Sequence, residues 1–327
     1  MYSNSYAIPF QGSISIAHNN LSILNRDSVS TYAVVGKNAV YLTSAQNGKA
    51  INESQIIPKP SREANDNQLF LITEAKFIKL RERTVLVIIT NKGIFFYEED
   101  GSNLIHYHPI NSRSENEKIF VRGVTGLEPN LLALGTSLGT ILIFEISSRS
   151  NKISILTEIN DPSIRGSITA LTSDSRGQLL GVGDSVGTCI AFNLENMKNI
   201  KTVSVFTESN NSVTCMCMWQ DYLIASFSHG VISIFDLVDD VHLIDINAHA
   251  RWIYSLDICK DLLVSSGEDC HFRVWQLSEV NKKVKASHLH SGLLTDTLIT
   301  SAQFNNKTDE ICISSFDGME LFVYKTQ

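Results

Sequence analysis

Two pairs of histidines are the first residues whose type and spacing suggest chemistry. His106 and His108, and likewise His288 and His290, are separated by one residue, which in a strand places both imidazoles of a pair on one face. Imidazoles bind transition metals, but a zinc site needs a third and a fourth ligand at suitable spacing. The sequence marks no such ligands, so we interpret all four as loop or surface histidines and expect no metal or other cofactor.

Motifs for nucleophilic or phosphate-transfer chemistry are also missing from the sequence. There is no G-x-S-x-G nucleophile elbow and no G-x-x-x-x-G-K-S/T phosphate-binding loop. The glycine pairs at positions 135 and 139 and at positions 183 and 187 fit the turns of β-hairpins instead. Asp184 and Asp317 lie in similar turns, where a carboxylate caps the backbone. The sequence therefore indicates a protein that is not an enzyme.

Composition and charge narrow the classes of partner. The chain has 327 residues, of which 43% are hydrophobic and 19% are charged, as expected for a folded globular protein. Its formal charge of −7 gives no overall attraction for nucleic acid or an acidic membrane. The first residues lack the basic and apolar regions of a signal peptide, and the six cysteines lack C-x-x-C spacing. We expect a cytoplasmic protein whose partners are proteins or peptides, a second copy of itself included.

A repeat of about 47 residues extends through the sequence. Each copy has an alternating apolar run, a tight turn that usually contains glycine, and a second alternating run that ends on an aromatic residue. Leu179–Gly183 followed by Gly187–Phe192 is one of the clearest copies, and each copy is a β-hairpin signature. The closing aromatic residues of the seven copies are Tyr41, Tyr97, Phe144, Phe192, Phe235, Trp275 and Tyr324.

Further short β-prone runs flank most of the hairpins, as Ile168–Leu171 and Lys152–Leu156 illustrate. They bring each unit to four strands, with no helical periodicity between units. Strand-rich units of this period are typical of a β-propeller, in which four-stranded blades pack face to face around a channel. The sequence thus predicts an all-β, seven-bladed β-propeller of four-stranded antiparallel blades, with residues 1–327 forming a single domain.

The last copy leaves too few residues for a complete blade. Only three residues follow Tyr324, so the outer strand of this blade must come from elsewhere. The N-terminal run Tyr6–Phe10 suits this position, because proline is tolerated in an edge strand. We therefore expect residues 1–12 to close the ring by joining the last blade. We also expect a long polar loop between the first and second blades at residues 43–67.

Residues 248–277 carry the most specific pattern in the sequence. They contain His249 near the start, an S-G-x-D turn from Ser266 to Asp269, and a closing Trp275. This pattern resembles a blade of the WD-repeat family, in which such His, Ser, Asp and Trp residues form a buried hydrogen-bonded relay. The resemblance implies this structural role for the four residues. It also implies a non-enzymatic interaction scaffold or adaptor, in signalling or cilium-associated complexes.

Binding is expected on the propeller face that is built from the turns inside the hairpins and the loops between blades. Arg251 and Trp252 are the strongest candidates, because Arg and Trp are enriched at interface hot spots and neither residue belongs to the relay. The alternative for Trp252 is a position packed between blades. Further candidates are Arg165, which precedes a predicted strand, and Lys92 and His229, which lie in hairpin turns.

Two narrower functions remain as alternatives. Some WD-repeat propellers are substrate receptors of ubiquitin ligases and dock through a W-D-x-R element. In this sequence the arginine position of that element is taken by other residues, namely Ser147, Glu195, Val238 and Ser278. The segment Phe120–Gly123 resembles the F-R-R-G element of phosphoinositide-binding propellers, but it has one arginine where two are needed to hold two headgroups.

Overall fold

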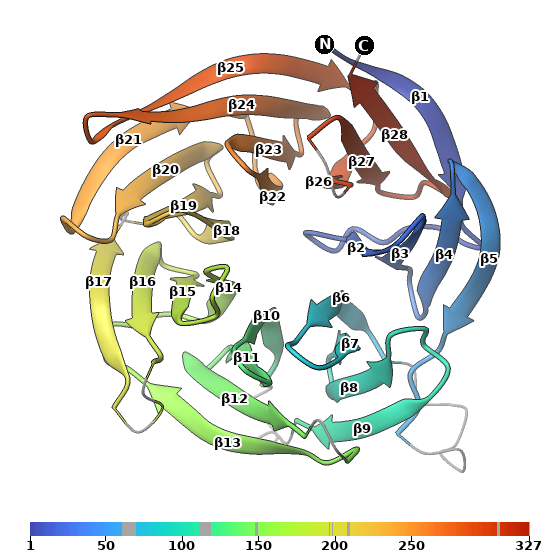
Figure 1. The fold of residues 1–327 in the computed structure, drawn as a ribbon, viewed down its shortest axis with the longest axis horizontal. Helices are drawn as coiled ribbons and strands as arrows, with labels where there is room; N and C mark the ends of the chain where they lie inside the picture. Colours follow the sequence, from blue (N-terminus) through green and yellow to red (C-terminus); the bar gives the residue numbers. More distant parts are fainter. Residues whose placement is uncertain are drawn as a thin grey trace.

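Seven four-stranded sheets surround a central channel in the computed structural model of the chain (Figure 1). The structure describes residues 1–60, 70–110, 119–147, 150–195, 197, 199–207, 210–305 and 308–326. Within these ranges every regular element is a strand, and neighbouring strands of a sheet are antiparallel. The predicted seven-bladed β-propeller is confirmed. No helix that is long and apolar enough to cross a membrane is found in the described ranges.

Each blade is formed by consecutive strands, except the seventh, which takes its outer strand from the N-terminus. From the channel outward, blades 1 and 2 comprise β2 (Ser22–Arg26), β3 (Val29–Val35), β4 (Val40–Gln46) and β5 (Lys49–Ile56), then β6 (Ile72–Lys79), β7 (Thr84–Thr90), β8 (Gly93–Glu98) and β9 (Leu104–Pro109). Blades 3 and 4 comprise β10 (Val121–Leu127), β11 (Leu131–Thr136), β12 (Thr140–Ile146) and β13 (Ile153–Asn160), then β14 (Ile168–Ser173), β15 (Leu179–Asp184), β16 (Thr188–Asn193) and β17 (Lys201–Thr207). Blades 5 and 6 comprise β18 (Val213–Trp219), β19 (Tyr222–Phe227), β20 (Val231–Asp236) and β21 (Val241–Asn247), then β22 (Ile253–Cys259), β23 (Leu262–Gly267), β24 (His271–Val280) and β25 (Lys283–Leu293). Blade 7 comprises β26 (Ile299–Phe304), β27 (Glu310–Ser315), β28 (Glu320–Thr326) and β1 (Tyr2–Pro9).

The middle strands of the blades are buried on both faces, because neighbouring blades cover them. All residues of β7 and β11 are buried. Between blades 1 and 2, for example, Val35 and Leu42 belong to the same apolar cluster as Ile88 and Phe95. Outer strands such as β5 are mostly exposed. Strands covered on both faces read as nearly continuous apolar runs, which is why the second and third strands of each blade dominate the sequence repeat.

The ring closes through β1, as the sequence predicts. This strand pairs antiparallel with β28 over its whole length. Ile8 and Phe10 are buried, and the Tyr6 hydroxyl donates a hydrogen bond to Glu310 Oε1 over 2.7 Å. The two ends of the chain therefore hold one blade together, and they lie side by side at the rim (Figure 1).

The prediction of a long loop at residues 43–67 is wrong for most of this range. β4 runs into this segment, and β5 follows it as the outer strand of blade 1. Residues 61–67 of the expected loop lie outside the described residues. Asn47 and Gly48 join the two strands with φ angles of 51° and 77°, as a tight hairpin turn requires. The polar sequence hides the strand because an outer strand is exposed on one face and needs few apolar residues.

Candidate functional site

The relay of the sixth blade runs through a serine that differs from the sequence assignment. His249 is buried, with its Nδ1 2.8 Å from Asp269 Oδ1 and its Nε2 2.8 Å from the hydroxyl of Ser265. The indole N–H of Trp275 donates to the same hydroxyl over 3.2 Å. His249, Asp269 and Trp275 are thus joined through Ser265. Ser266, which the S-G-x-D pattern assigned to this position, takes no part.

Strand alternation explains the different serine, because neighbouring residues of a strand face opposite sides of the sheet. Leu263 is paired with Trp275 in the register of β23 and β24, so Ser265, two residues further along, shares the face of Trp275. Ser266 faces the other side, where its hydroxyl lies 2.7 Å from that of Ser255. The turn pattern alone does not specify the face; the residue paired with Trp275 does.

The charged and titratable side chains of the relay pair with one another. Arg273 Nη1 donates to Asp269 Oδ2 over 2.9 Å. Burial opposes the charge of Asp269, but the contacts with His249, the backbone N–H of Ala250 and the charge of Arg273 together outweigh it and hold the pKa of this carboxyl well below its usual value. Burial lowers the pKa of His249 although Asp269 acts in the opposite direction, so the imidazole is neutral near pH 7. Buried polar groups that pair in this way satisfy one another's hydrogen bonds within the blade.

The two histidine pairs lie in outer strands, where the sequence analysis expected loop or surface positions. His106 and His108 are in β9, and His288 and His290 are in β25. They pack against aromatic rings; His108, for example, lies edge-on to Phe144 with 5.1 Å between the ring centroids. In the described part of the chain, no group of three or more His, Cys, Asp or Glu side chains is placed to hold a metal ion.

The five candidate binding residues lie on one face of the propeller. Because consecutive strands are antiparallel, the loops before the inner strands and the turns between the second and third strands meet at the same end, which we call the upper face. Arg165, Arg251 and Trp252 precede inner strands, and Lys92 and His229 lie in turns between second and third strands. Arg165, Arg251 and His229 are exposed, whereas Lys92 is partly buried.

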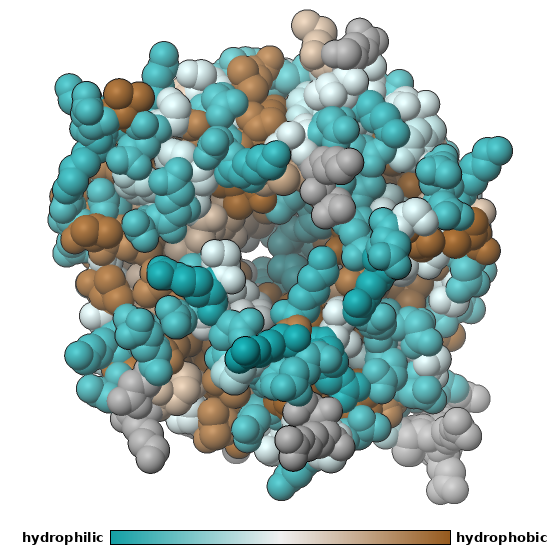
Figure 2. Space-filling model, viewed as in Figure 1, coloured by the Kyte–Doolittle hydropathy of each residue, from teal (hydrophilic) through white to brown (hydrophobic). Residues whose placement is uncertain are grey.

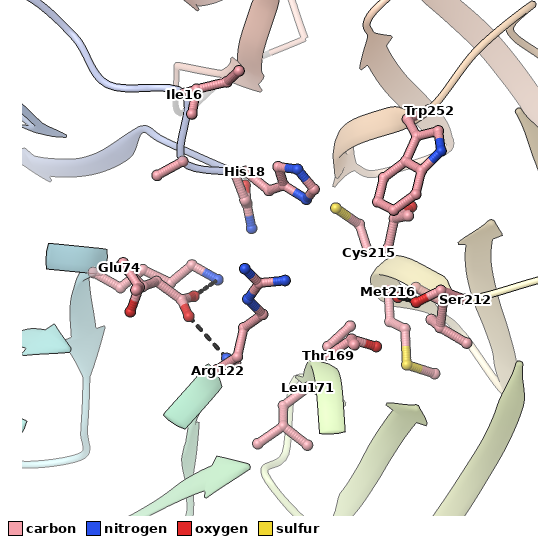
Figure 3. A pocket seen from close by; sticks show the side chains of 18 of the residues that line it. Ile16, His18, Glu74, Arg122, Thr169, Leu171, Ser212, Cys215, Met216 and Trp252 are labelled. Carbon is pink, nitrogen blue, oxygen red and sulfur yellow. Dashed lines mark hydrogen bonds and ion pairs between the residues drawn. The ribbon is translucent and has the colours of Figure 1, made fainter. Parts of the chain in front are cut away.

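The mouth of the channel on the upper face holds a cavity of about 310 Å³ (Figure 3). Trp252 lines this cavity and is 43% exposed, so it is not packed away between blades. Its indole meets the ring of His18 edge-on, with centroids 5.9 Å apart, and His18 stacks on Tyr254 at 4.3 Å. The cavity lining does not include the other four candidates, which are Arg165, Arg251, His229 and Lys92.

His18 reaches the mouth on the segment between β1 and β2. The backbone N–H of Asn19 donates to the carbonyl of Tyr254 over 2.9 Å, which holds this segment against blade 6. Burial, and then the charge of Arg122, lower the pKa of His18 to about 4, so its ring is neutral at pH 7. Sequence reasoning missed this residue because its position depends on how the ring closes.

Arg122 extends into the middle of the same mouth from β10, between Glu74 on one side and Cys215 and Met216 on the other (Figure 3). Its side chain is exposed, and it forms no hydrogen bond or ion pair with any residue that the structure describes. The sequence singled out this arginine only as part of the phosphoinositide-like segment. The structure instead places it at the centre of the channel mouth, as a single cation.

Most other blades have a threonine where blade 3 has Arg122. The inner strands of blades 2 to 7 begin with an apolar residue, and Arg122 is the next residue in blade 3. In four of the other blades this second residue is a threonine: Thr73, Thr169, Thr214 and Thr300. Each threonine hydroxyl bonds to the second strand of its own blade, as Thr214 does to the Ser226 hydroxyl over 2.8 Å. Arg122 makes no such bond.

A buried carboxylate beside Arg122 is already occupied. Glu74 Oε1 lies 2.8 Å from Lys76 Nζ, and Glu74 Oε2 accepts the backbone N–H of Gly123 over 2.9 Å. Gly123 forms the bulge in β10 at a φ of 80°, and a Cβ there would lie 3.0 Å from the backbone nitrogen of Leu171. Glu74 therefore balances Lys76 and fixes the bulge that follows Arg122, so the charge left over in the mouth is positive.

Exposed apolar side chains surround this mouth. In the described part of the chain, nine large ones lie in the loops and turns of the upper face: Ile16, Ile57, Leu71, Phe120, Leu138, Val186, Trp252, Phe316 and Met319. The opposite face, which we call the lower face, carries mainly hydrophilic side chains around the channel opening (Figure 2). Exposed apolar side chains that gather on one face of a soluble protein mark it as a protein interaction surface.

Comparisons with known proteins agree with this architecture. The family model described as WDR54 matches residues 1–325. The chain belongs to the WDR54 family. WD repeat domain 54 of Rattus norvegicus is 27% identical, with 93% of each chain covered. WD repeat-containing protein 54 of Mus musculus is 25% identical with 100% of each chain covered, and that of Homo sapiens is 25% identical with 96% covered.

A solved structure shares the fold of this WDR54-family chain. A chain in the crystal structure of a mitotic checkpoint complex superposes with a TM-score of 0.70, covering 99% of this chain and 92% of that one. The two sequences are 13% identical, so the likeness shows the propeller fold alone. The binding properties of the WDR54-family chain must therefore be inferred from its own side chains.

Proposed function

We propose that this WDR54-family protein is a non-enzymatic scaffold that binds partner proteins through the upper face of its propeller. The observation that carries the proposal is the rim of exposed apolar side chains around a positively charged channel mouth. Apolar side chains supply area to bury on association, and a polar centre sets the orientation of the partner. The proposal agrees with the family, since WD-repeat propellers generally bind other proteins.

The test compares the partners that wild type and a double variant, Arg251→Glu with Trp252→Ala, capture from the native cell, identified by mass spectrometry. Both residues are exposed on the upper face. The matched control is Val238→Ala with Val280→Ala, which removes exposed apolar surface at lower-face turns. The melting temperatures of the three proteins are first shown to agree. Partners lost only in the upper-face variant support the proposal. An unchanged set, or equal loss in the control, contradicts it.

The same purification separates the ubiquitin-ligase alternative. A ligase subunit among the captured partners would favour a substrate receptor, although the four blades with a comparable motif lack the arginine of W-D-x-R. We place the scaffold in the cytoplasm, because the six cysteines lack the spacing of a disulfide framework. Fluorescence microscopy of the tagged chain tests this location, and a signal confined to cilia would point to cilium-associated complexes.

A further inference from the structure

We propose that the channel mouth binds the side-chain carboxylate of an aspartate or glutamate in a partner protein, with the Arg122 guanidinium as the group that pairs with it. The inference rests on the proposed upper-face binding function and names the chemistry recognised there. A guanidinium offers two parallel N–H donors that match the two oxygens of a carboxylate.

An arginine at this position is not required by the fold. Four other inner strands place a threonine there and use its hydroxyl to hold their own blade together. Arg122 has no partner among the described residues and remains exposed over the cavity. A long cation that contributes nothing to its own blade is available for a group that comes from outside the described chain.

Glu74, the buried carboxylate beside Arg122, is not its partner, since no hydrogen bond or ion pair joins the two described side chains. Its Oε1 lies 2.8 Å from Lys76 Nζ, and its Oε2 accepts the N–H of Gly123 over 2.9 Å. Both contacts hold Glu74 in place, because one is an ion pair and the other fixes a backbone bulge. The ion pair cancels the charge of Lys76 within the cavity, and the charge of Arg122 remains uncompensated.

The charge available in the mouth suits a monoanion better than a phosphate dianion. Lys76 is already paired, and His18 is neutral at pH 7 because burial lowers its pKa to about 4. Arg122 is then the single unpaired cation of the cavity lining in the described residues, and the carboxylate of Glu74 would repel a dianion. A phosphate group generally needs more than one cation. A carboxylate matches one guanidinium.

The rest of the cavity indicates how the carboxylate is presented. A volume of about 310 Å³ is at the lower end of the range for ligand pockets, which suits one or two side chains. Ile16 and Trp252 line its edge and are exposed, so apolar side chains beside the acidic residue have surface to cover. We therefore expect an acidic residue flanked by apolar ones.

The test uses the three tryptophan indoles of the full chain as reporters in nitrogen-15 NMR. Trp252 lines the cavity, whereas Trp219 and Trp275 are buried elsewhere and donate to Asp261 and Ser265. The probe is the peptide acetyl-Leu-Glu-Leu-amide, with acetyl-Leu-Gln-Leu-amide as its neutral match. We expect a saturable shift of the Trp252 signal with a Kd on the order of 1 mM, and binding of the glutamine peptide about tenfold weaker. The other two indole signals should stay in place.

Two variants decide whether Arg122 carries the binding. Arg122→Thr introduces the residue that four other blades hold at this position, so it should fold, and it should weaken the glutamate peptide about tenfold. Lys37→Gln removes an exposed cation of the same face, in the turn between β3 and β4 and outside the cavity, and should bind as wild type does.

Several outcomes would overturn the inference. These are no Trp252 shift, equal binding of the glutamate and glutamine peptides, wild-type binding by Arg122→Thr, or tighter binding of acetyl-Leu-phosphoserine-Leu-amide. If the peptide test gives one of these outcomes while partners are still lost from the Arg251 and Trp252 double variant, the proposed function stands and the carboxylate site fails. If the peptide binds as expected but the captured partners do not change, the site stands and the scaffold proposal fails.

Discussion

Replacing Ser265 with alanine should destabilise the protein more than the same change at Ser266 beside it. The Ser265 hydroxyl accepts the Trp275 indole N–H over 3.2 Å and lies 2.8 Å from His249 Nε2. Alanine leaves both of these buried nitrogen atoms without a partner. The Ser266 hydroxyl has the Ser255 hydroxyl beside it, and that hydroxyl keeps a backbone N–H as a second partner when Ser266 is removed.

The expected magnitudes follow from the number of buried groups left unpaired. Each such group costs about 1–3 kcal/mol. Ser265→Ala should therefore lower the free energy of unfolding by about 2–6 kcal/mol, and Ser266→Ala by about 1–2 kcal/mol. Because folded domains are stable by about 5–15 kcal/mol, the first variant should still fold at room temperature.

Urea unfolding followed by tryptophan fluorescence and by circular dichroism measures both changes. Ser278→Ala in the same blade is the control, since its partly exposed hydroxyl has no hydrogen-bond partner among the described residues, and it should leave stability unchanged. The reasoning is refuted if Ser266→Ala costs as much as Ser265→Ala, because the histidine and tryptophan would then not depend on Ser265.

Three further predictions concern the channel and the ring. Gly123→Ala should cost more than about 1 kcal/mol in urea unfolding, because its φ of 80° disfavours a side chain and the new Cβ would lie 3.0 Å from the backbone of Leu171; an unchanged midpoint would contradict this. Asp257→Asn should stabilise the protein at pH 7.5 by at most about 3 kcal/mol, because burial raises the pKa of Asp257 from 3.8 to about 6. The ionised group is thus a penalty above pH 6 that fades as the pH falls toward 3.8, so thermal melts of the two proteins should converge near pH 4, and a constant difference would speak against the shift. Deleting residues 1–12 removes β1 with the buried Ile8 and Phe10 and should cost at least about 3 kcal/mol, whereas a melt like that of wild type would show that blade 7 does not need this strand.

The propeller was predictable because its signals are local. Alternating runs and turn glycines, as in Leu179–Gly183, act within one hairpin and recur in each blade. Ring closure followed from the three residues left after Tyr324. Outer strands are exposed on one side and carry little apolar signal, so β5 is marked only by its Asn47-Gly48 turn.

The site was less predictable because different blades contribute to it. Trp252 could be chosen from its type and its place before a strand, but His18 and Glu74 come from segments that meet only in the closed ring. Arg122 did have a signal in the sequence. Its inner strand begins Val-Arg-Gly-Val, whereas two others begin Ile-Thr-Ala-Leu and Val-Thr-Cys-Met. Comparing the blades position by position identifies it, while composition and charge do not.

The bulges of the inner strands explain how one residue at the channel mouth can change at little cost to the fold. In blades 2 to 7 the pairing of the inner strand shifts near its start, which re-aims the side chains at that end. In blade 3, Gly123 takes up the bulge and Glu74 accepts its N–H, so Arg122 is released from holding the blade. Blade 1 has no such bulge in the pairing of β2, and the segment with His18 lies over the channel there. The mouth is therefore asymmetric, with one cation facing an aromatic wall, and partner selectivity should depend on these departures from the repeat in blades 1 and 3.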